Sequence, residues 1–461
     1  MKLRSFLMVG AAFVAGAVAL PMAEHTALSW GFDLMPVANA AESSRAETYR
    51  LLNLFSDVFE RVRADYVEPV KDKDLVENAI NGMLTGLDPH SSYMNAKSFT
   101  DMQVQTKGEF GGLGLEVTGE AGFVKVISPI DDTPAQRAGM KAGDLITSID
   151  GKSVQGLSLN EAVEKMRGKA DTAILLTVKR EGIDKPVEFN LKREVIKVPS
   201  VKSHLEGDDV GYIRISSFTE QSDVGVRKAL DELRAKSNHK LAGIVLDLRN
   251  DPGGLLDQAV AVGQDFIHDG EIVSTRARHT EDNQRWDAHD GDLTGGMPMV
   301  VLINSGSASA SEIVAGALQD HRRAVLMGTR SFGKGSVQTV IPLPGDGAMR
   351  LTTARYYTPS GRSIQGLGVE PDIEVRDSRV EPAKFVPDHE ADLKGAIENK
   401  GGVAQTTMPP RTDLPTISKD IPKIPPENAP TFDAAKPETD FQLQQALKVV
   451  RAMETTAHAT K

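Results

Sequence analysis

Cysteine is absent from this chain of 461 residues. Its absence excludes disulfide bonds, a thiolate nucleophile and a cysteine-ligated zinc site. Histidine is sparse, with 10 residues, and no two of them form the His-Glu-x-x-His pattern of a helical zinc site. Basic residues are fewer than acidic ones, 53 against 64, which gives a net charge of −11. We therefore expect no metal site and no nucleic-acid partner, because phosphates repel an acidic surface.

The N-terminus has the pattern of an export signal. Residues 6–20 form an apolar run that follows Lys2 and Arg4 and precedes a small-residue site, Ala-Asn-Ala at 38–40. A run of about fifteen residues is short for a membrane span and suits a secretory signal. The gap before the small residues is longer than usual, so an uncleaved anchor stays an alternative. We expect residues 1–40 to be a signal peptide or membrane anchor and the protein to be periplasmic or otherwise exported, with membrane association left open.

The rest of the chain is too long for one ordinary hydrophobic core. Its composition and hydrophobic spacing change several times, which indicates several domains. Residues 41–96 have apolar positions at helical spacing, which predicts helices that pack on the body or on a second subunit. Residues 97–190 alternate short strands and turns around one helix, as in a small α+β domain. Residues 191–376 alternate buried strands and helices, which predicts an α/β domain. Residues 377–461 are Pro-rich and predict an extended linker before a last helix at 441–453.

Ser309 begins one of the predicted helices and has small neighbours. The pattern Ser309-Ala-Ser-Glu312 fits a helix capping box, which is a purely structural interpretation. A catalytic role is compatible with it, because a serine at a helix N-terminus lies beside unpaired N–H groups that can stabilise an oxyanion. Gly306, Ala308 and Ala310 are small enough to let a peptide backbone approach closely.

Lys334 follows 25 residues after Ser309, between Gly333 and Gly335. Most lysines are solvated surface charges, but partial burial would lower the pKa of this amine and leave part of it neutral. A neutral amine can accept the serine proton, as in Ser–Lys variants of the catalytic triad. The pair predicts a serine protease that needs no histidine.

Two alternatives concern the same segment. Residues 328–334 nearly match a phosphate-binding P-loop, but Gly335 stands where a Ser or Thr is required, and the following residues predict a strand instead of a helix. A histidine could replace the lysine as base. His321 lies roughly 18 Å along the same helix and cannot reach Ser309, whereas spacing alone does not exclude His279 or His289.

A glycine pair completes the candidate site. Gly253 and Gly254 follow a predicted buried strand, where α/β folds place ligands, and they expose backbone N–H groups. A Pro-Gly-Gly sequence also suits a plain turn.

Together these segments resemble the carboxyl-terminal (tail-specific) processing proteases, over roughly residues 45–376. The resemblance implies a mixed, crotonase-like α/β protease core with Ser309 as nucleophile, Lys334 as general base and Gln338 as support for the lysine. It also implies oxyanion donors from Gly253, Gly254 and the amide of Ala310, and no cofactor.

Residues 97–190 resemble a PDZ domain inserted before that core. Gly111 and the four residues Gly112, Leu113, Gly114 and Leu115 look like its carboxylate-binding loop. Consecutive amides can form a nest for a C-terminal carboxylate, while the peptide adds a strand to a sheet edge. Arg167 matches an arginine that links the PDZ domain to the active site in some relatives.

The combined prediction is an exported serine endopeptidase that takes protein substrates by their C-terminal tails. A catalytically silent PDZ scaffold is the alternative, and the P-loop NTPase is disfavoured. The helices at both ends lead us to expect a homo-oligomer, a dimer or larger, and an adaptor protein is left open.

Overall fold

The computed structural model describes residues 37–238, 240–345, 347–377, 389–399, 411–433 and 436–459. Most of the predicted signal segment, residues 1–36, lies outside these ranges. No helix in the described ranges is both long and apolar enough to span a membrane. Contacts divide the chain into Met1–Val76 and Glu77–Lys461.

The first unit contains a long helix, α1 (Val37–Asp65), and the start of α2 (Asp72–Thr85). Two helices were predicted here, and the structure confirms them. The apolar residues that revealed α1 are exposed in the single chain: Leu51, Leu54, Phe55 and Val58 are each more than half exposed. The apolar face of an amphipathic helix normally packs against a hydrophobic core, whereas these side chains of α1 are exposed.

The core of the second unit is a six-stranded sheet in the order β10-β11-β12-β15-β16-β19. Strand β10 is antiparallel to β11, and the remaining neighbours are parallel. Side chains alternate between two buried faces, so Ile244 and Val245 enter different clusters, and the middle of their strand, residues 244–246, is entirely apolar. The strands are β10 (Val201–Glu206), β11 (Val210–Ile215), β12 (Gly243–Asp247), β15 (Met299–Ile303), β16 (Val325–Gly328) and β19 (Ile373–Glu374).

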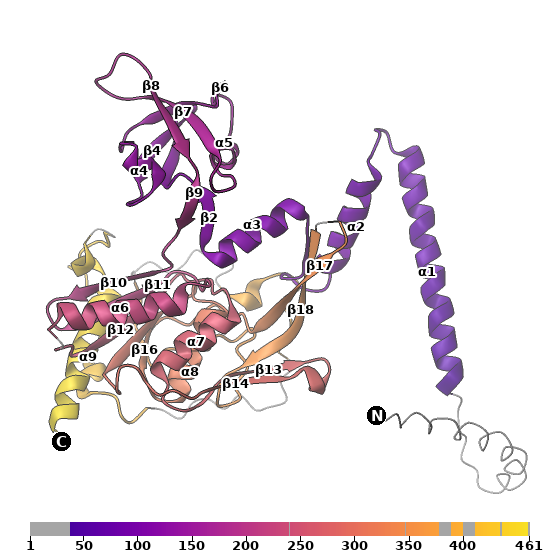
Figure 1. Cartoon of the computed structure of the whole chain (residues 1–461). Coiled ribbons are helices and arrows are strands. Elements are labelled where there is room, and N and C mark those ends of the chain that lie inside the picture. Colours follow the sequence, from indigo (N-terminus) through magenta and orange to yellow (C-terminus); the bar gives the residue numbers. More distant parts are fainter. Residues whose placement is uncertain are drawn as a thin grey trace, which may run out of the picture. The chain divides into compact units, whose positions relative to one another are not determined.

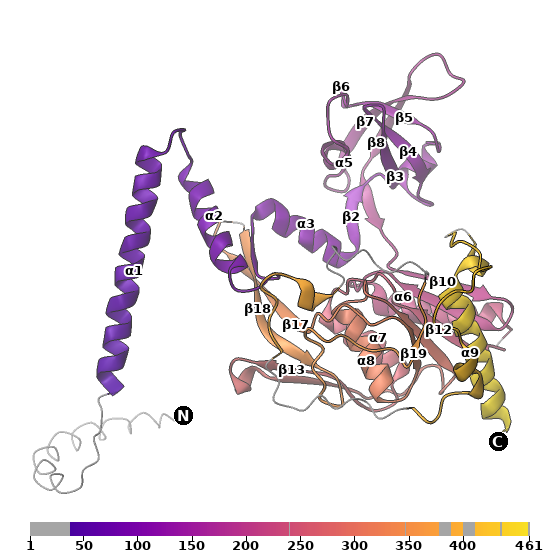
Figure 2. The ribbon, with the colours of Figure 1, turned by 180° about the vertical axis from the view of Figure 1, so that it is seen from behind.

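Helices cover both faces of this sheet (Figures 1 and 2). Three of them pack on one face: α6 (Ser222–Lys236), α7 (Leu256–Phe266) and α8 (Ala310–Asp320). The C-terminal helix α9 (Phe441–Ala459) packs on the other. The predicted α/β core is therefore confirmed, with a mixed sheet.

A second sheet, β1-β18-β13-β14 with β17 paired to β18, lies beside the first one. Strands β17 and β18 carry Gln338 and Tyr356 to the candidate site. The elements are β1 (Ser92–Met94), α3 (Ala96–Lys107), β13 (Gly270–Ala277), η1 (Thr280–Asp282), β14 (Gln284–Ala288), β17 (Ser336–Leu343) and β18 (Gly347–Tyr357).

The small domain has its own core and a sheet in the order β3-β4-β5-β7-β8, with β6 paired to β5. A two-stranded ribbon, β2 with β9, leads the chain in and out, as an inserted domain requires. Strand β3 lies at the sheet edge, where a peptide can add a strand. The elements are β2 (Glu109–Gly112), β3 (Leu115–Glu120), β4 (Phe123–Pro129), α4 (Pro134–Arg137), β5 (Leu145–Ile149), β6 (Lys152–Ser153), α5 (Leu159–Met166), β7 (Ala173–Lys179), β8 (Val187–Lys192) and β9 (Glu194–Lys197).

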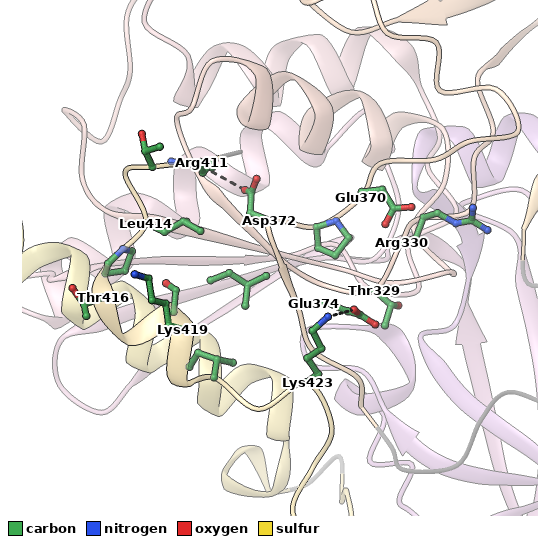
Figure 3. Close-up of a pocket in the computed structure, with 16 residues that line it drawn as sticks. Thr329, Arg330, Glu370, Asp372, Glu374, Arg411, Leu414, Thr416, Lys419 and Lys423 are labelled. Atoms are coloured by element: carbon green, nitrogen blue, oxygen red, sulfur yellow. Dashed lines mark hydrogen bonds and ion pairs between the residues drawn. The ribbon is translucent and has the colours of Figure 1, made fainter. Parts of the chain in front are cut away.

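Part of the Pro-rich tail packs along the edge strand β19. Lys423 pairs with Glu374 at 2.9 Å and Arg411 lies 3.5 Å from Asp372, on the walls of a cavity of about 1030 Å³ (Figure 3). The backbone N–H of Arg376 also donates to the carbonyl oxygen of Lys423. Residues 411–423 are thus held against the core. The described part of the tail also contains the short 3₁₀ helices η2 (Glu390–Asp392), η3 (Thr416–Asp420) and η4 (Pro437–Thr439).

Candidate functional site

Ser309 precedes α8 in a backbone conformation that is rare for a residue with a side chain. Its φ is 55° and ψ is −112°, a combination that costs of order 1–3 kcal/mol unless the surroundings impose it. The residue is buried, and its N–H donates to Glu312 Oε2 at 2.9 Å. This is the glutamate bond that the capping pattern predicted. The strained turn points to a position fixed for a purpose other than helix capping alone.

The glycine turn packs directly against this serine. A Cβ at Gly253, where φ is +92°, would lie 2.6 Å from the Ala308 carbonyl oxygen and 2.8 Å from the Ala310 nitrogen. Only glycine therefore fits there. The Gly253 N–H donates to Asp251 Oδ1 at 2.8 Å, and the Asp251 carbonyl oxygen accepts the N–H of Ala308. The turn and the start of α8 are thus joined, as the predicted oxyanion site requires.

Glu312 also holds the loop that carries Lys334. Its carboxylate accepts the N–H groups of Gly333 at 2.7 Å and Lys334 at 2.9 Å, together with the hydroxyl of Ser331. The side chain is fully buried, and burial raises the pKa of Glu312 to about 7. One carboxylate therefore fixes the serine and the lysine loop relative to each other.

Lys334 is partly buried, and this burial lowers the pKa of its amine. The Arg350 guanidinium lowers the pKa of Lys334 further, while the carboxylates of Glu390, Glu312 and Asp88 oppose the shift. Desolvation is the largest of these effects, so a larger share of the amine is neutral at moderate pH than in a free lysine.

A cavity of about 1100 Å³ brings the predicted residues together. Its walls include six of them: Ser309, Lys334, Gln338, Gly253, Gly254 and Arg167. The Gln338 amide nitrogen donates to Ser336 Oγ at 2.9 Å and to Thr352 Oγ1 at 3.3 Å, which fixes its side chain. The Arg167 guanidinium lies 4.7 Å from the ring centre of Phe110, which lines the same cavity.

The remaining predicted residues are not among those that line this cavity. Gly112, Leu113, Gly114 and Leu115 connect β2 to β3 in the small domain, where Leu113 is buried in the core. Gly114 has φ +75° and its carbonyl oxygen accepts the N–H of Ile130. Ala310 is the first residue of α8, and its nitrogen faces the Gly253 turn.

The alternatives from sequence fare differently. Lys334 is followed by strand β17, so the helix that a P-loop must open is not there. No histidine of the described ranges lines the Ser309 cavity, and His279 lines a separate one. His321 Nε2 hydrogen-bonds the Glu271 carbonyl oxygen. In the part of the chain that the structure describes, no three His, Asp or Glu side chains gather to hold a metal ion.

Sequence reasoning missed two residues that line the Ser309 cavity, Tyr356 and Arg350. Tyr356 lines the same cavity as Ser309, and burial raises the pKa of Tyr356 to about 12. Arg350 lines the cavity and acts on the charge of Lys334. Both lie on β18, far from any motif, so no local signal could have revealed them. The capping pattern predicted the bond of Glu312 to Ser309 but gave no sign of its bonds to the lysine loop.

Three segments of the chain match models of known protein families. Residues 209–375 match the model of peptidase family S41, residues 125–180 match a PDZ domain, and residues 13–98 match the N-terminal domain of the activating protease CtpB. The fold is that of an S41 peptidase with a PDZ domain.

The chain is also similar to individual proteins that are named as carboxyl-terminal processing proteases. The carboxy-terminal-processing protease of Bartonella bacilliformis is 54% identical over 382 residues, which is 81% of this chain and 88% of that protein. The carboxyl-terminal-processing protease of Synechocystis sp. is 35% identical over 352 residues, 74% of this chain and 81% of the relative. A solved photosystem II D1 C-terminal processing protease is 30% identical, with a TM-score of 0.41 and coverage of 70% and 92%. This chain belongs to the carboxy-terminal-processing protease family.

Proposed function

We propose that this protein is an exported serine endopeptidase that recognises C-terminal tails with its PDZ domain and cleaves through a Ser309–Lys334 dyad. The observation that supports it best is the cavity shared by Ser309 and Lys334, in which burial lowers the pKa of the lysine. A lowered pKa is what a lysine needs in order to act as a base near neutral pH.

In the proposed mechanism, neutral Lys334 takes the proton of Ser309 Oγ as the oxygen attacks the scissile carbonyl carbon. The peptide C–N bond then breaks, and the lysine ammonium returns the proton to the leaving amine. A water molecule, deprotonated by Lys334, hydrolyses the acyl-enzyme. Gly254 and Ala310 are the proposed oxyanion donors, since the Gly253 N–H already donates to Asp251. Gln338, fixed by Ser336 and Thr352, supports the lysine.

The PDZ domain is proposed to bind the substrate's C-terminus. Edge strand β3 offers backbone pairing, and the turn at residues 112–115 offers amides to the terminal carboxylate. Arg167 follows α5 of this domain and lines the Ser309 cavity, so it is the proposed link between tail binding and cleavage.

Export and self-association are part of the proposal. The basic start and apolar run support export, and N-terminal sequencing of the protein from a fractionated cell tests it. The exposed apolar face of α1 supports a homo-oligomer, which sedimentation of the chain with and without residues 41–65 would test. An adaptor that stimulates cleavage is compatible with this assignment.

The decisive test compares purified residues 41–461 with Ser309→Ala and Lys334→Ala on an unfolded protein that has an apolar C-terminus. We expect cleavage by the wild type, loss in both variants, and a rise of kcat/KM with pH through the lowered pKa of Lys334. Lys423→Ala serves as the matched lysine control, because the Lys423 side chain pairs with Glu374 and lies outside the Ser309 cavity. Cleavage by Ser309→Ala would refute the dyad, and inactivity of the wild type would favour the scaffold.

A further inference from the structure

A short tail segment, residues 389–397, contacts the loop that carries Lys334. The Glu390 N–H donates to the Phe332 carbonyl oxygen at 2.9 Å, and His389 Nδ1 lies 3.1 Å from the Ser331 carbonyl oxygen. Both oxygens belong to the residues that lead into Lys334. The tail therefore takes part in fixing the backbone on the N-terminal side of the lysine.

The Glu390 side chain reaches the other side of the lysine through one intermediary. Gln365 Nε2 donates to Glu390 Oε1 at 3.0 Å, and Gln365 Oε1 accepts the N–H of Gly335 at 3.0 Å. Both Glu390 and Gln365 are fully buried. The two neighbours of the catalytic turn, Phe332 and Gly335, are thus tied to the same tail residue.

His90 completes the surroundings of this carboxylate. Its Nε2 lies 3.0 Å and 2.8 Å from the two oxygens of Glu390. The His90 carbonyl oxygen accepts Arg350 Nε at 3.1 Å, and Arg350 lines the Ser309 cavity. The histidine comes from the segment between α2 and β1, so residues remote in sequence meet at Glu390.

The same segment connects to Gln338. The N–H of His90 donates to Asp88 Oδ1 at 2.8 Å, and the Thr352 hydroxyl donates to that oxygen at 3.1 Å. Thr352 in turn accepts the amide of Gln338. A continuous set of hydrogen bonds therefore runs from the tail carboxylate to the side chain proposed to support the lysine.

A fully buried carboxylate is costly unless its partners compensate, and an apolar residue would fill the same space at less cost. Here the backbone N–H of Glu390 bonds the lysine loop directly, and its carboxylate leads through Gln365 to the same loop and through His90 to a cavity residue. We propose that Glu390 is a positioning residue for Lys334, held in place by His90 and Gln365, so that tail residues 389–397 complete the catalytic loop. This inference rests on the proposed dyad.

The test uses the full chain with Glu390→Gln, His90→Leu and His90→Gln. We expect Glu390→Gln to lower kcat by roughly ten- to a hundredfold, the scale of a small misplacement of a catalytic group, and to leave KM within about twofold. His90→Leu should act in the same direction, whereas His90→Gln, which keeps a donor, should recover part of the loss. His204→Leu removes a similar pair, in which the ring nitrogen lies 2.7 Å from Glu206 on another part of the core, and should leave kcat unchanged.

Two readouts separate positioning from simple loss of folded protein. Titration of Ser309 with a fluorophosphonate counts folded sites, and kcat is expressed per titrated site. The pH profile is the second: Arg350, Glu390, Glu312 and Asp88 act on Lys334, and removing the Glu390 charge should move the rise of kcat/KM to lower pH.

A Glu390→Gln enzyme with wild-type kcat per site overturns the inference, and so does a loss accompanied by an unmoved pH profile. A wild type that cleaves no peptide, or a Ser309→Ala variant that does, refutes the dyad itself whatever Glu390 does. The two failures are thus distinguishable.

Discussion

Glu312→Gln tests the most heavily bonded group of the site. Four groups donate to this carboxylate, from Ser309, Ser331, Gly333 and Lys334, and these bonds favour the charged form. Burial disfavours the charged form, and the two effects oppose each other. Since the pKa of Glu312 is raised from 4.5 to about 7, burial outweighs the four hydrogen bonds.

The sign of the pH effect follows from that shift. Between pH 4.5 and 7 the folded protein retains a proton on Glu312 that the unfolded chain has released, so this group makes wild-type stability fall as pH rises. At 1.36 kcal/mol per pH unit, the fall amounts to about 3 kcal/mol over the window. Glutamine does not titrate. The unfolding free energy of wild type minus that of Glu312→Gln should therefore decrease by about 3 kcal/mol from pH 4.5 to pH 8.

Tryptophan fluorescence during urea unfolding measures this difference. Residues 41–461 retain a single tryptophan, Trp286, which is packed against the core of the protease domain. Asp251 and Asp265 also have raised pKa values, about 7 and about 8, but they are the same in both proteins and cancel. A difference that stays constant with pH, or that grows as pH rises, would refute the reasoning.

Three further changes test the geometry around the proposed Ser309–Lys334 dyad. Tyr356→Phe removes a hydroxyl from the cavity that Ser309 lines and should lower kcat about three- to tenfold, the worth of one hydrogen bond to the reacting groups; an unchanged kcat would count against a role for the tyrosine. Gly253→Ala should lower kcat/KM by more than about a hundredfold, because its Cβ would clash with Ala308 and Ala310. Gly361→Ala, at φ +80° with open space around it, is the matched control and should stay active. Arg350→Gln should raise the pKa of Lys334 and move the rise of kcat/KM to higher pH, opposite to Glu390→Gln, as a pH–rate profile would show.

The sequence was most informative where local physics decides the structure. The apolar run at residues 244–248 predicts a strand that is buried on both faces. The structure has β12 there, with side chains in the hydrophobic clusters on both sides of the sheet. The one helix expected within residues 97–190 is α5 (Leu159–Met166), which the structure shows to begin with a Ser158–Glu161 capping box. Ser309, Lys334 and the glycine turn stood out as candidates through a capping pattern, flanking glycines and a Pro-Gly-Gly sequence, and the resemblance to the processing proteases supplied their predicted roles.

The surroundings of those residues were not predictable in this way. Tyr356 enters the Ser309 cavity from β18, and Glu390 reaches the lysine loop from a tail whose composition suggested only an extended linker. Such contacts depend on how sheets and tail pack in space, and a single sequence carries no periodicity or motif that reports them. Glu312 shows the opposite limit, since its local pattern was correct but described only one of its four hydrogen bonds.

Charged groups from distant segments of the chain act on the pKa of Lys334. Desolvation lowers the pKa of the amine. A base whose pKa is far below the working pH accepts a proton poorly, so too large a shift would weaken Lys334 as a base. Arg350 adds to the lowering, while carboxylates from α8, from the segment before β1 and from the tail counteract it. The basicity of the lysine is therefore set by groups from across the chain. It follows that Glu390→Gln and Arg350→Gln combined should return the pH profile toward that of the wild type, whereas the loss of positioning in Glu390→Gln should remain. Recovery of the profile without recovery of kcat would separate the two contributions of the tail carboxylate, its charge and its hydrogen bonds.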